Sequence, residues 1–146
     1  MKQILFFAVM LSLTQFGCKK SDCLESEPKS LDGKWRMITV KDNASGLTTT
    51  KSPSIQNNVD LIFTSTNLNS GTFIGNTPTN EISKNSYSTG TNQTITIPVL
   101  SMTKVAETSW GILFVDNICS SQAYTFEIGE RLNIKTTNKT LTFLKQ

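Results

Sequence analysis

The sequence contains no histidine, so it lacks the side chain that most often serves as general base, metal ligand or activator of a nucleophilic Ser or Cys. The glycine-rich phosphate-binding and nucleotide-binding motifs and the G-x-S-x-G nucleophile motif are also missing. The 11 acidic residues include no obvious pair flanked by glycines or aromatics, as a carboxylate-based glycosidase would need. We therefore expect no enzymatic activity, no metal and no cofactor.

Charge is sparse as well. The 14 basic and 11 acidic residues are scattered along the chain, and no RNA- or DNA-binding motif interleaves basic residues with aromatics. We expect no nucleic-acid partner.

Only one long apolar run is present, and it lies at the N-terminus. Lys2 precedes this run, which covers residues 4–13. A spanning helix needs roughly 20 apolar residues, about twice this length. A positive residue followed by a short apolar run is typical of a secretory signal, so we expect export with cleavage.

Gly17-Cys18 follows the apolar run and resembles the end of a bacterial lipoprotein signal, in which a cysteine after a small residue is acylated and becomes the mature N-terminus. Gln15 and Phe16 depart from that pattern, which normally has an aliphatic residue and then a small one. An ordinary cleavage site fits less well, because Gln15 is not small. We expect residues 1–17 to be a signal peptide, with palmitate on Cys18 holding the protein to the membrane, in the cell envelope at the outer membrane. The alternative is that Cys18 is a third thiol of a secreted protein.

Two other cysteines remain if Cys18 is acylated. A free thiol is a liability in an oxidising compartment, so we expect a disulfide between Cys23 and Cys119. It would close a loop of about 97 residues, worth roughly 4 to 5 kcal/mol in the chain-entropy model. Metal binding by these thiols is less favoured, because there is no C-x-x-C pair.

The polar segment after the signal predicts a linker. Residues 18–30 contain Pro28 and show no periodicity, so we expect a flexible, lipid-anchored tether. The remaining residues, 31–146, suffice for one domain of ordinary size.

Alternation of apolar and polar residues predicts short β-strands through most of that domain. In the first strand, Trp35, Met37 and Thr39 should share one face. A polar loop over residues 42–57 should separate it from a second strand around residues 59–64. Further strands are expected near residues 73–74, 85–89 and 95–99, where Pro98 favours an edge or a bulge, and at 122–128, 131–136 and 140–144, which tight turns join into a β-meander.

The period changes once, and this predicts one helix near residues 107–117. Trp110, Phe114 and Ile118 fall at helical spacing. Gly111 weakens this interpretation, and the alternation of Trp110 with Ile112 leaves a strand open. Both Trp110 and Trp35 are expected in the core, with a ligand-facing role as the alternative.

About eight short antiparallel strands and one helix hide their edges best in a closed or strongly curved barrel-like sheet. The predicted fold class is therefore mostly β.

The order of several short segments between Asp60 and Phe143 resembles the META domain of small, heat-shock-associated bacterial envelope lipoproteins. The segments are Leu61-Ile62-Phe63, Phe73-Ile74-Gly75, Asn80, Tyr87, Ile95-Thr96-Ile97, Met102-Thr103, Tyr124-Thr125-Phe126 and Leu141-Thr142-Phe143. Two cysteines that the family commonly carries are missing, since Thr79 precedes Asn80 and Lys104-Val105-Ala106 follows Thr103. The resemblance implies a barrel-like domain with a non-enzymatic role in stress tolerance or protein contacts, and it names no protein partner.

A second resemblance competes with the first. Gly33-Lys34-Trp35 is similar to the Gly-x-Trp that opens the first strand of lipocalin-like envelope proteins. That resemblance implies a cavity for a small apolar ligand inside the barrel. A filled interior would favour the META-like function, and an open apolar cavity of several hundred Å³ would favour the lipocalin-like one.

Overall fold

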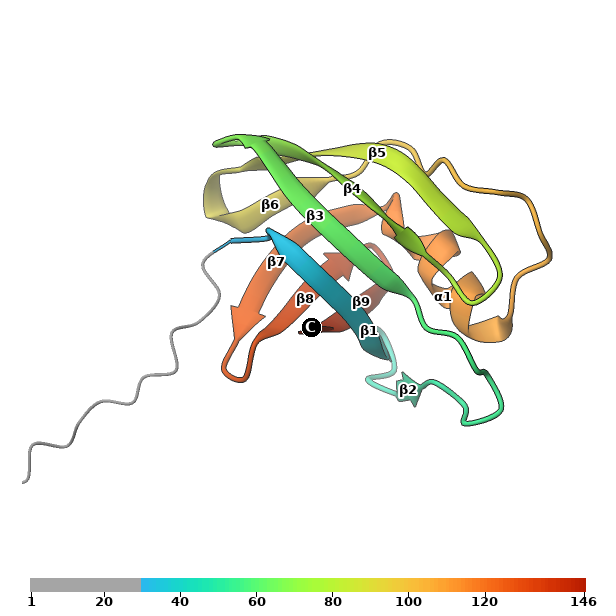
Figure 1. Ribbon diagram of the computed structural model, residues 1–146. Helices are drawn as coiled ribbons and strands as arrows, with labels where there is room; N and C mark the ends of the chain where they lie inside the picture. Colours follow the sequence, from blue (N-terminus) through green and yellow to red (C-terminus); the bar gives the residue numbers. More distant parts are fainter. Residues whose placement is uncertain (1–29) are drawn as a thin grey trace, which may run out of the picture.

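The computed structural model describes residues 30–146 (Figure 1). The expected signal peptide, the acylation site Cys18 and the disulfide partner Cys23 lie outside the described residues, so those expectations stay predictions. No helix within the described part of the chain is long and apolar enough to cross a membrane.

The elements of the described chain are β1 (Gly33–Asp42), β2 (Thr48–Thr50), β3 (Asp60–Asn67), β4 (Ser70–Asn76), β5 (Glu81–Gly90), the short 3-10 turn η1 (Thr91–Gln93), β6 (Thr94–Thr96), α1 (Ser109–Ile118), β7 (Ser121–Glu127), β8 (Arg131–Thr136) and β9 (Lys139–Lys145).

The strands form one antiparallel sheet that closes on itself. From β3 to β9 each strand pairs with the next along the chain, β1 pairs with β3, and β9 returns to pair with β1. The three-residue β2 lies outside this circuit, against the end of β1. The predicted fold class is thus confirmed: the protein is mostly β, with an eight-stranded barrel and one helix.

The interior of the barrel is filled by side chains. Trp35, Leu61, Phe63, Leu132, Ile134, Leu141 and Phe143 are all buried. The rings of Phe63 and Phe73 lie 5.3 Å apart, and those of Trp35 and Phe126 lie 6.1 Å apart. Side chains from nearly every strand thus meet in one core, as in other small barrels.

The predicted helix is present, and the strand alternative for this segment is wrong. α1 begins one residue after Thr108, whose hydroxyl caps the helix by accepting from the Gly111 N–H (3.2 Å). Trp110, Phe114 and Ile118 are buried together on one face. Figure 1 shows α1 on the side of the barrel away from the point where the N-terminal segment joins β1.

One prediction for β1 is wrong. Trp35 and Met37 point into the core, but the pairing of β1 with β9 shifts register between Met37 and Thr39. A bulge of this kind adds one residue to a strand and resets its alternation. As a result Val40 is buried instead, whereas Thr39 is only half-buried and pairs with Thr50 of β2.

The strand expected near residues 95–99 is shorter than its sequence pattern indicates. β6 ends at Thr96, before Pro98, whose nitrogen cannot donate to a ladder. The chain continues beside β5 with isolated backbone hydrogen bonds, from Ser83 N–H to the Ser101 oxygen (3.0 Å) and from Thr103 N–H to the Glu81 oxygen (3.0 Å).

Candidate functional site at the mouth of the barrel

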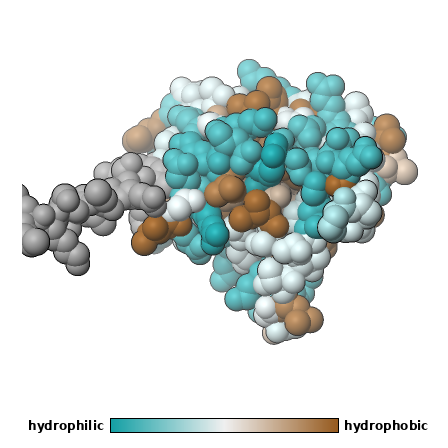
Figure 2. Space-filling model, turned by 60° about the horizontal axis from the view of Figure 1, so that its bottom comes forward, coloured by the Kyte–Doolittle hydropathy of each residue, from teal (hydrophilic) through white to brown (hydrophobic). Residues whose placement is uncertain are grey.

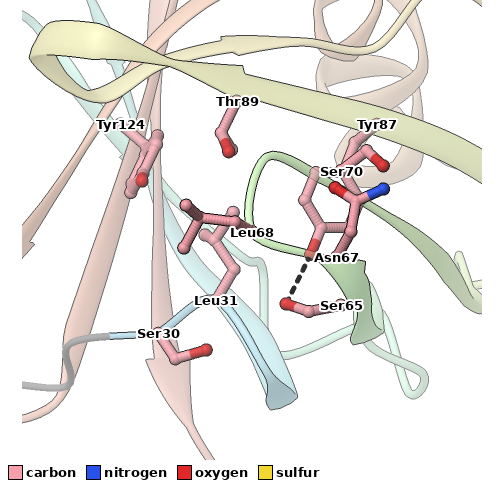
Figure 3. A pocket seen from close by; sticks show the side chains of 9 residues that line it. All are labelled: Ser30, Leu31, Ser65, Asn67, Leu68, Ser70, Tyr87, Thr89 and Tyr124. Atoms are coloured by element: carbon pink, nitrogen blue, oxygen red, sulfur yellow. Dashed lines mark hydrogen bonds between the residues drawn. The ribbon is translucent and has the colours of Figure 1, made fainter.

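A pocket of about 290 Å³ opens at the end of the barrel where the N-terminal segment joins β1. We call it the mouth pocket (Figure 3). Its walls come from the start of the described chain, the β3–β4 turn, the end of β5 and the middle of β7. They are formed by Ser30, Leu31, Ser65, Asn67, Leu68, Ser70, Tyr87, Thr89 and Tyr124.

The β3–β4 turn forms one wall and is fixed from two sides. The Asn67 side-chain oxygen accepts from the Asn69 N–H (3.0 Å), an Asx-type bond that stabilises tight turns. The Asn69 carbonyl oxygen accepts from the Thr89 N–H (2.8 Å), which ties the turn to β5. Leu68, at the tip, is 94% exposed.

Tyr87 lies on the opposite side of the view in Figure 3 from Tyr124, with Thr89 and Leu68 between them. The Tyr87 ring packs edge-on against Phe63, 5.3 Å between centroids, and its hydroxyl shares a hydrogen bond with the Ser65 hydroxyl (3.2 Å). Gly71 makes room for this ring, because a Cβ there would lie 2.5 Å from the phenol oxygen. The absence of a side chain at Gly71 therefore allows the Tyr87 hydroxyl to occupy this position.

Two ionisable groups lie at or beside the pocket, and one is neutral while the other is charged. Burial, together with the nearby Asp32 carboxylate, raises the pKa of the Tyr87 phenol, so it stays neutral. Burial alone would raise the pKa of Asp32, but hydrogen bonds from Ser65 and Ser30 lower it. The Ser65 N–H donates to Asp32 Oδ1 at 2.6 Å, so a fixed negative charge lies beside the pocket.

The two tryptophans singled out from the sequence do not line the mouth pocket. Trp35 is fully buried and donates from Nε1 to the Leu31 carbonyl oxygen (2.6 Å). The Lys145 ammonium lies over the Trp35 ring, 5.6 Å from its centroid. Trp110 is 2% exposed, and its Nε1 has no hydrogen-bond partner among residues 30–146.

Cys119 is exposed at the C-terminal end of α1 and lines a separate, shallow groove of about 640 Å³ with Met102, Val105 and Val115. Partial burial raises the pKa of its thiol, which therefore stays protonated at neutral pH. Its expected partner, Cys23, lies outside the described residues.

The pocket residues carry no motif that marks them as a site in the sequence. They come from distant parts of the chain, and Ser, Thr and Asn are so common in this sequence that no spacing distinguishes them. The turn-forming residues from Asn67 to Ser70, between two strands, are the one feature of the sequence that indicates where a wall of the pocket lies. Within residues 30–146 no group of three or more Cys, Asp or Glu side chains is arranged to hold a metal ion.

Comparison of the chain with protein-family models, with curated proteins and with solved structures gives no match.

Proposed function

We propose that this protein is a bacterial cell-envelope lipoprotein, held at the outer membrane by a lipid on Cys18 and acting through its surface, without catalysis. The observation that carries the proposal is the Gly17-Cys18 pair directly after a short apolar run. A role in stress tolerance or protein contacts follows from the META-like order of its segments, which is itself part of the proposal.

The filled barrel supports a function carried out at the surface. Phe63, Leu132 and Phe143 occupy the interior with almost no exposure, so the described core holds side chains where a lipocalin-like protein holds its ligand. The face seen in Figure 2 is mainly hydrophilic, with hydrophobic residues in small separate groups. Exposed apolar residues of this scattered kind are usual on soluble surfaces.

Detergent phase separation tests the lipid anchor. Protein expressed in its bacterial host should partition into the detergent phase, and Cys18→Ser should move it to the aqueous phase. Cys23→Ser is the matched control, because it removes a nearby thiol and leaves the acylation site intact. Equal partitioning of Cys18→Ser and wild type would contradict the proposal.

A lipocalin-like binder of a small apolar ligand is the second candidate, favoured by the closed barrel and by Gly33-Lys34-Trp35 at the start of its first strand. A fluorescent lipophile distinguishes the two candidates. The filled interior leads us to expect no saturable binding. Saturable binding that a core substitution abolishes would support the second candidate.

A further inference from the structure

The mouth pocket combines features that suit one class of ligand. Its lining offers six hydroxyl groups, one carboxamide, two aromatic rings and two leucines, and it includes no Lys, Arg, Asp or Glu. We infer that the mouth pocket binds a neutral sugar ring, either as a free sugar or as the terminal unit of a glycan. This inference goes beyond the proposed envelope role and does not depend on acylation of Cys18.

Several polar groups of the pocket are available to a ligand. Three of these groups have no hydrogen-bond partner within residues 30–146: the Tyr124 hydroxyl, the Thr89 hydroxyl and the side-chain nitrogen of Asn67. A polyhydroxylated ligand can bond to all three, because each of its hydroxyls both donates and accepts. Figure 3 shows Tyr124 and Asn67 on opposite sides of Leu68, with Thr89 above it.

The Tyr124 ring provides the apolar part of the recognition. A tyrosine presents a flat apolar face and a polar edge, which matches a sugar ring with its C–H faces and equatorial hydroxyls. The Tyr124 ring is held edge-on against Phe126, 5.6 Å between centroids. The Tyr124 ring is therefore oriented before any ligand arrives, which reduces the entropic cost of binding. Tyr87 is only 3% exposed and packs against Phe63, so it forms a buried wall of the pocket and offers no free ring face.

Charge argues against anionic ligands. A phosphate or carboxylate site normally supplies Arg or Lys donors, and the lining has none. The Asp32 carboxylate, which accepts from Ser65 N–H, adds a negative charge beside the pocket, and the nearby Lys145 ammonium offsets part of that charge. The lowered pKa of Asp32 keeps its charge in place at neutral pH.

The size of the pocket limits the ligand to about one ring. Its volume of about 290 Å³ is at the lower end of the range of small-molecule sites. Because the pocket opens at the barrel end, the rest of a longer glycan could extend into solvent.

A titration followed by backbone-amide NMR tests the inference on the full-length protein in a zwitterionic detergent that carries no sugar. The probes are glucose, N-acetylglucosamine, the neutral trisaccharide chitotriose and, as the anionic comparator, glucuronate. We expect a neutral probe to shift the amide signals of Ser70, Thr89 and Tyr124. Shifts with the monosaccharides identify a free sugar as sufficient, whereas shifts with chitotriose alone identify the end of a glycan, and either result supports the inference.

Two variants locate the binding. Tyr124→Phe and Thr89→Val each remove one hydroxyl and keep the side-chain shape, and each should weaken the neutral sugar by about tenfold. Thr48→Val, on the exposed strand β2, is the matched control and should bind as wild type does.

Three outcomes would overturn the inference: no shift with any neutral sugar, equal binding of glucuronate, or wild-type affinity in both Tyr124→Phe and Thr89→Val. A failure here leaves the lipid anchor untouched, because that proposal is tested by partitioning.

Discussion

Glu107 joins two parts of the chain through one carboxylate. Its Oε1 accepts from the Thr79 hydroxyl and from the Thr108 N–H, both at 2.9 Å. Its Oε2 accepts from the Thr77 hydroxyl and from the Asn80 side-chain nitrogen, the latter at 3.0 Å. The carboxylate thus connects the β4–β5 turn to the start of α1, where it also complements the positive end of the helix dipole.

The pKa of Glu107 makes this connection sensitive to acid. Burial by itself would raise the pKa, but the hydrogen bonds from Thr77, Asn80, Thr108 and Thr79 lower it below its ordinary value of 4.5. A carboxyl with a lowered folded-state pKa contributes stability above its unfolded-state pKa and loses it as the pH falls through the folded-state value. The contribution of Glu107 is therefore complete at neutral pH and declines below about pH 4.5.

Glu107→Gln should lower the free energy of unfolding at neutral pH by about 1 to 3 kcal/mol, because an amide offers only one oxygen to four donors. Urea denaturation at neutral pH and below pH 4.5 should show the difference between wild type and variant shrinking as the solution becomes acidic. Glu81→Gln, an exposed position on the neighbouring strand, is the control and should change little. A constant difference at every pH would show that the carboxylate charge does not matter.

At the scale of elements, Gly111 within α1 is explained by its contact with the Glu107 side chain. A Cβ on Gly111 would lie 2.2 Å from Cδ and 2.3 Å from Oε1 of the Glu107 side chain. Glycine inside a helix usually costs about 1 kcal/mol relative to alanine. From the sequence, this glycine weakens the prediction of a helix, whereas in the structure it leaves space for the carboxylate that holds the helix in place.

Gly111→Ala is therefore expected to destabilise the protein, because the pinned Glu107 carboxylate must move. In a Glu107→Ala background the same change should stabilise it, by up to about 1 kcal/mol, since only the helix preference remains. A double-mutant cycle by chemical denaturation measures this coupling. The same sign of effect in both backgrounds would refute the steric explanation.

The sequence predicted the elements whose signal is local. The helical spacing of Trp110 and Phe114 and the turns between the last three strands are properties of neighbouring residues, and both predictions are confirmed. The bulge in β1 and the short β2 depend on strand pairing between distant segments. The mouth pocket depends on barrel closure for the same reason, so its residues could not be recognised before the fold was known.

At the scale of the whole molecule, the expected Cys23–Cys119 bridge depends on whether the segment between Cys23 and the barrel is long enough to reach Cys119. Two hydrogen bonds connect the residue after Cys119 to the end of β1 through the β8–β9 turn: Ser120 accepts from the Thr137 N–H, and the next residue, Asn138, accepts from the Asn43 N–H. The ten residues of β1 measure about 30 Å at the usual rise per residue. The seven steps from Cys23 to Ser30 span at most about 25 Å. The disulfide itself adds about 6 Å between the two Cα atoms, so even with it a bridge would require this segment to run fully extended along the barrel.

Peptide mapping without reduction tests that bridge. If it forms as predicted, a peptide containing Cys23 should be recovered joined to one containing Cys119, and neither thiol should react with a label after denaturation. Complete labelling of Cys119 in protein taken from the cell envelope would rule the bridge out.

Trp35 connects the barrel core with the start of the described chain. It packs against Phe126, lies under Lys145 and donates to the Leu31 oxygen, so one side chain contacts β7, β9 and the residues before β1. Truncating a buried aromatic of this size costs about 3 to 5 kcal/mol, a large part of the stability of a small domain. Trp35→Ala should accordingly lower the denaturation midpoint sharply, whereas Trp35→Phe, which keeps a ring but loses the N–H, should lower it less. The same preparations can be titrated with a fluorescent lipophile. If Trp35→Ala keeps near-wild-type stability but loses lipophile binding, Trp35 lines a ligand cavity. That result would favour the lipocalin-like alternative.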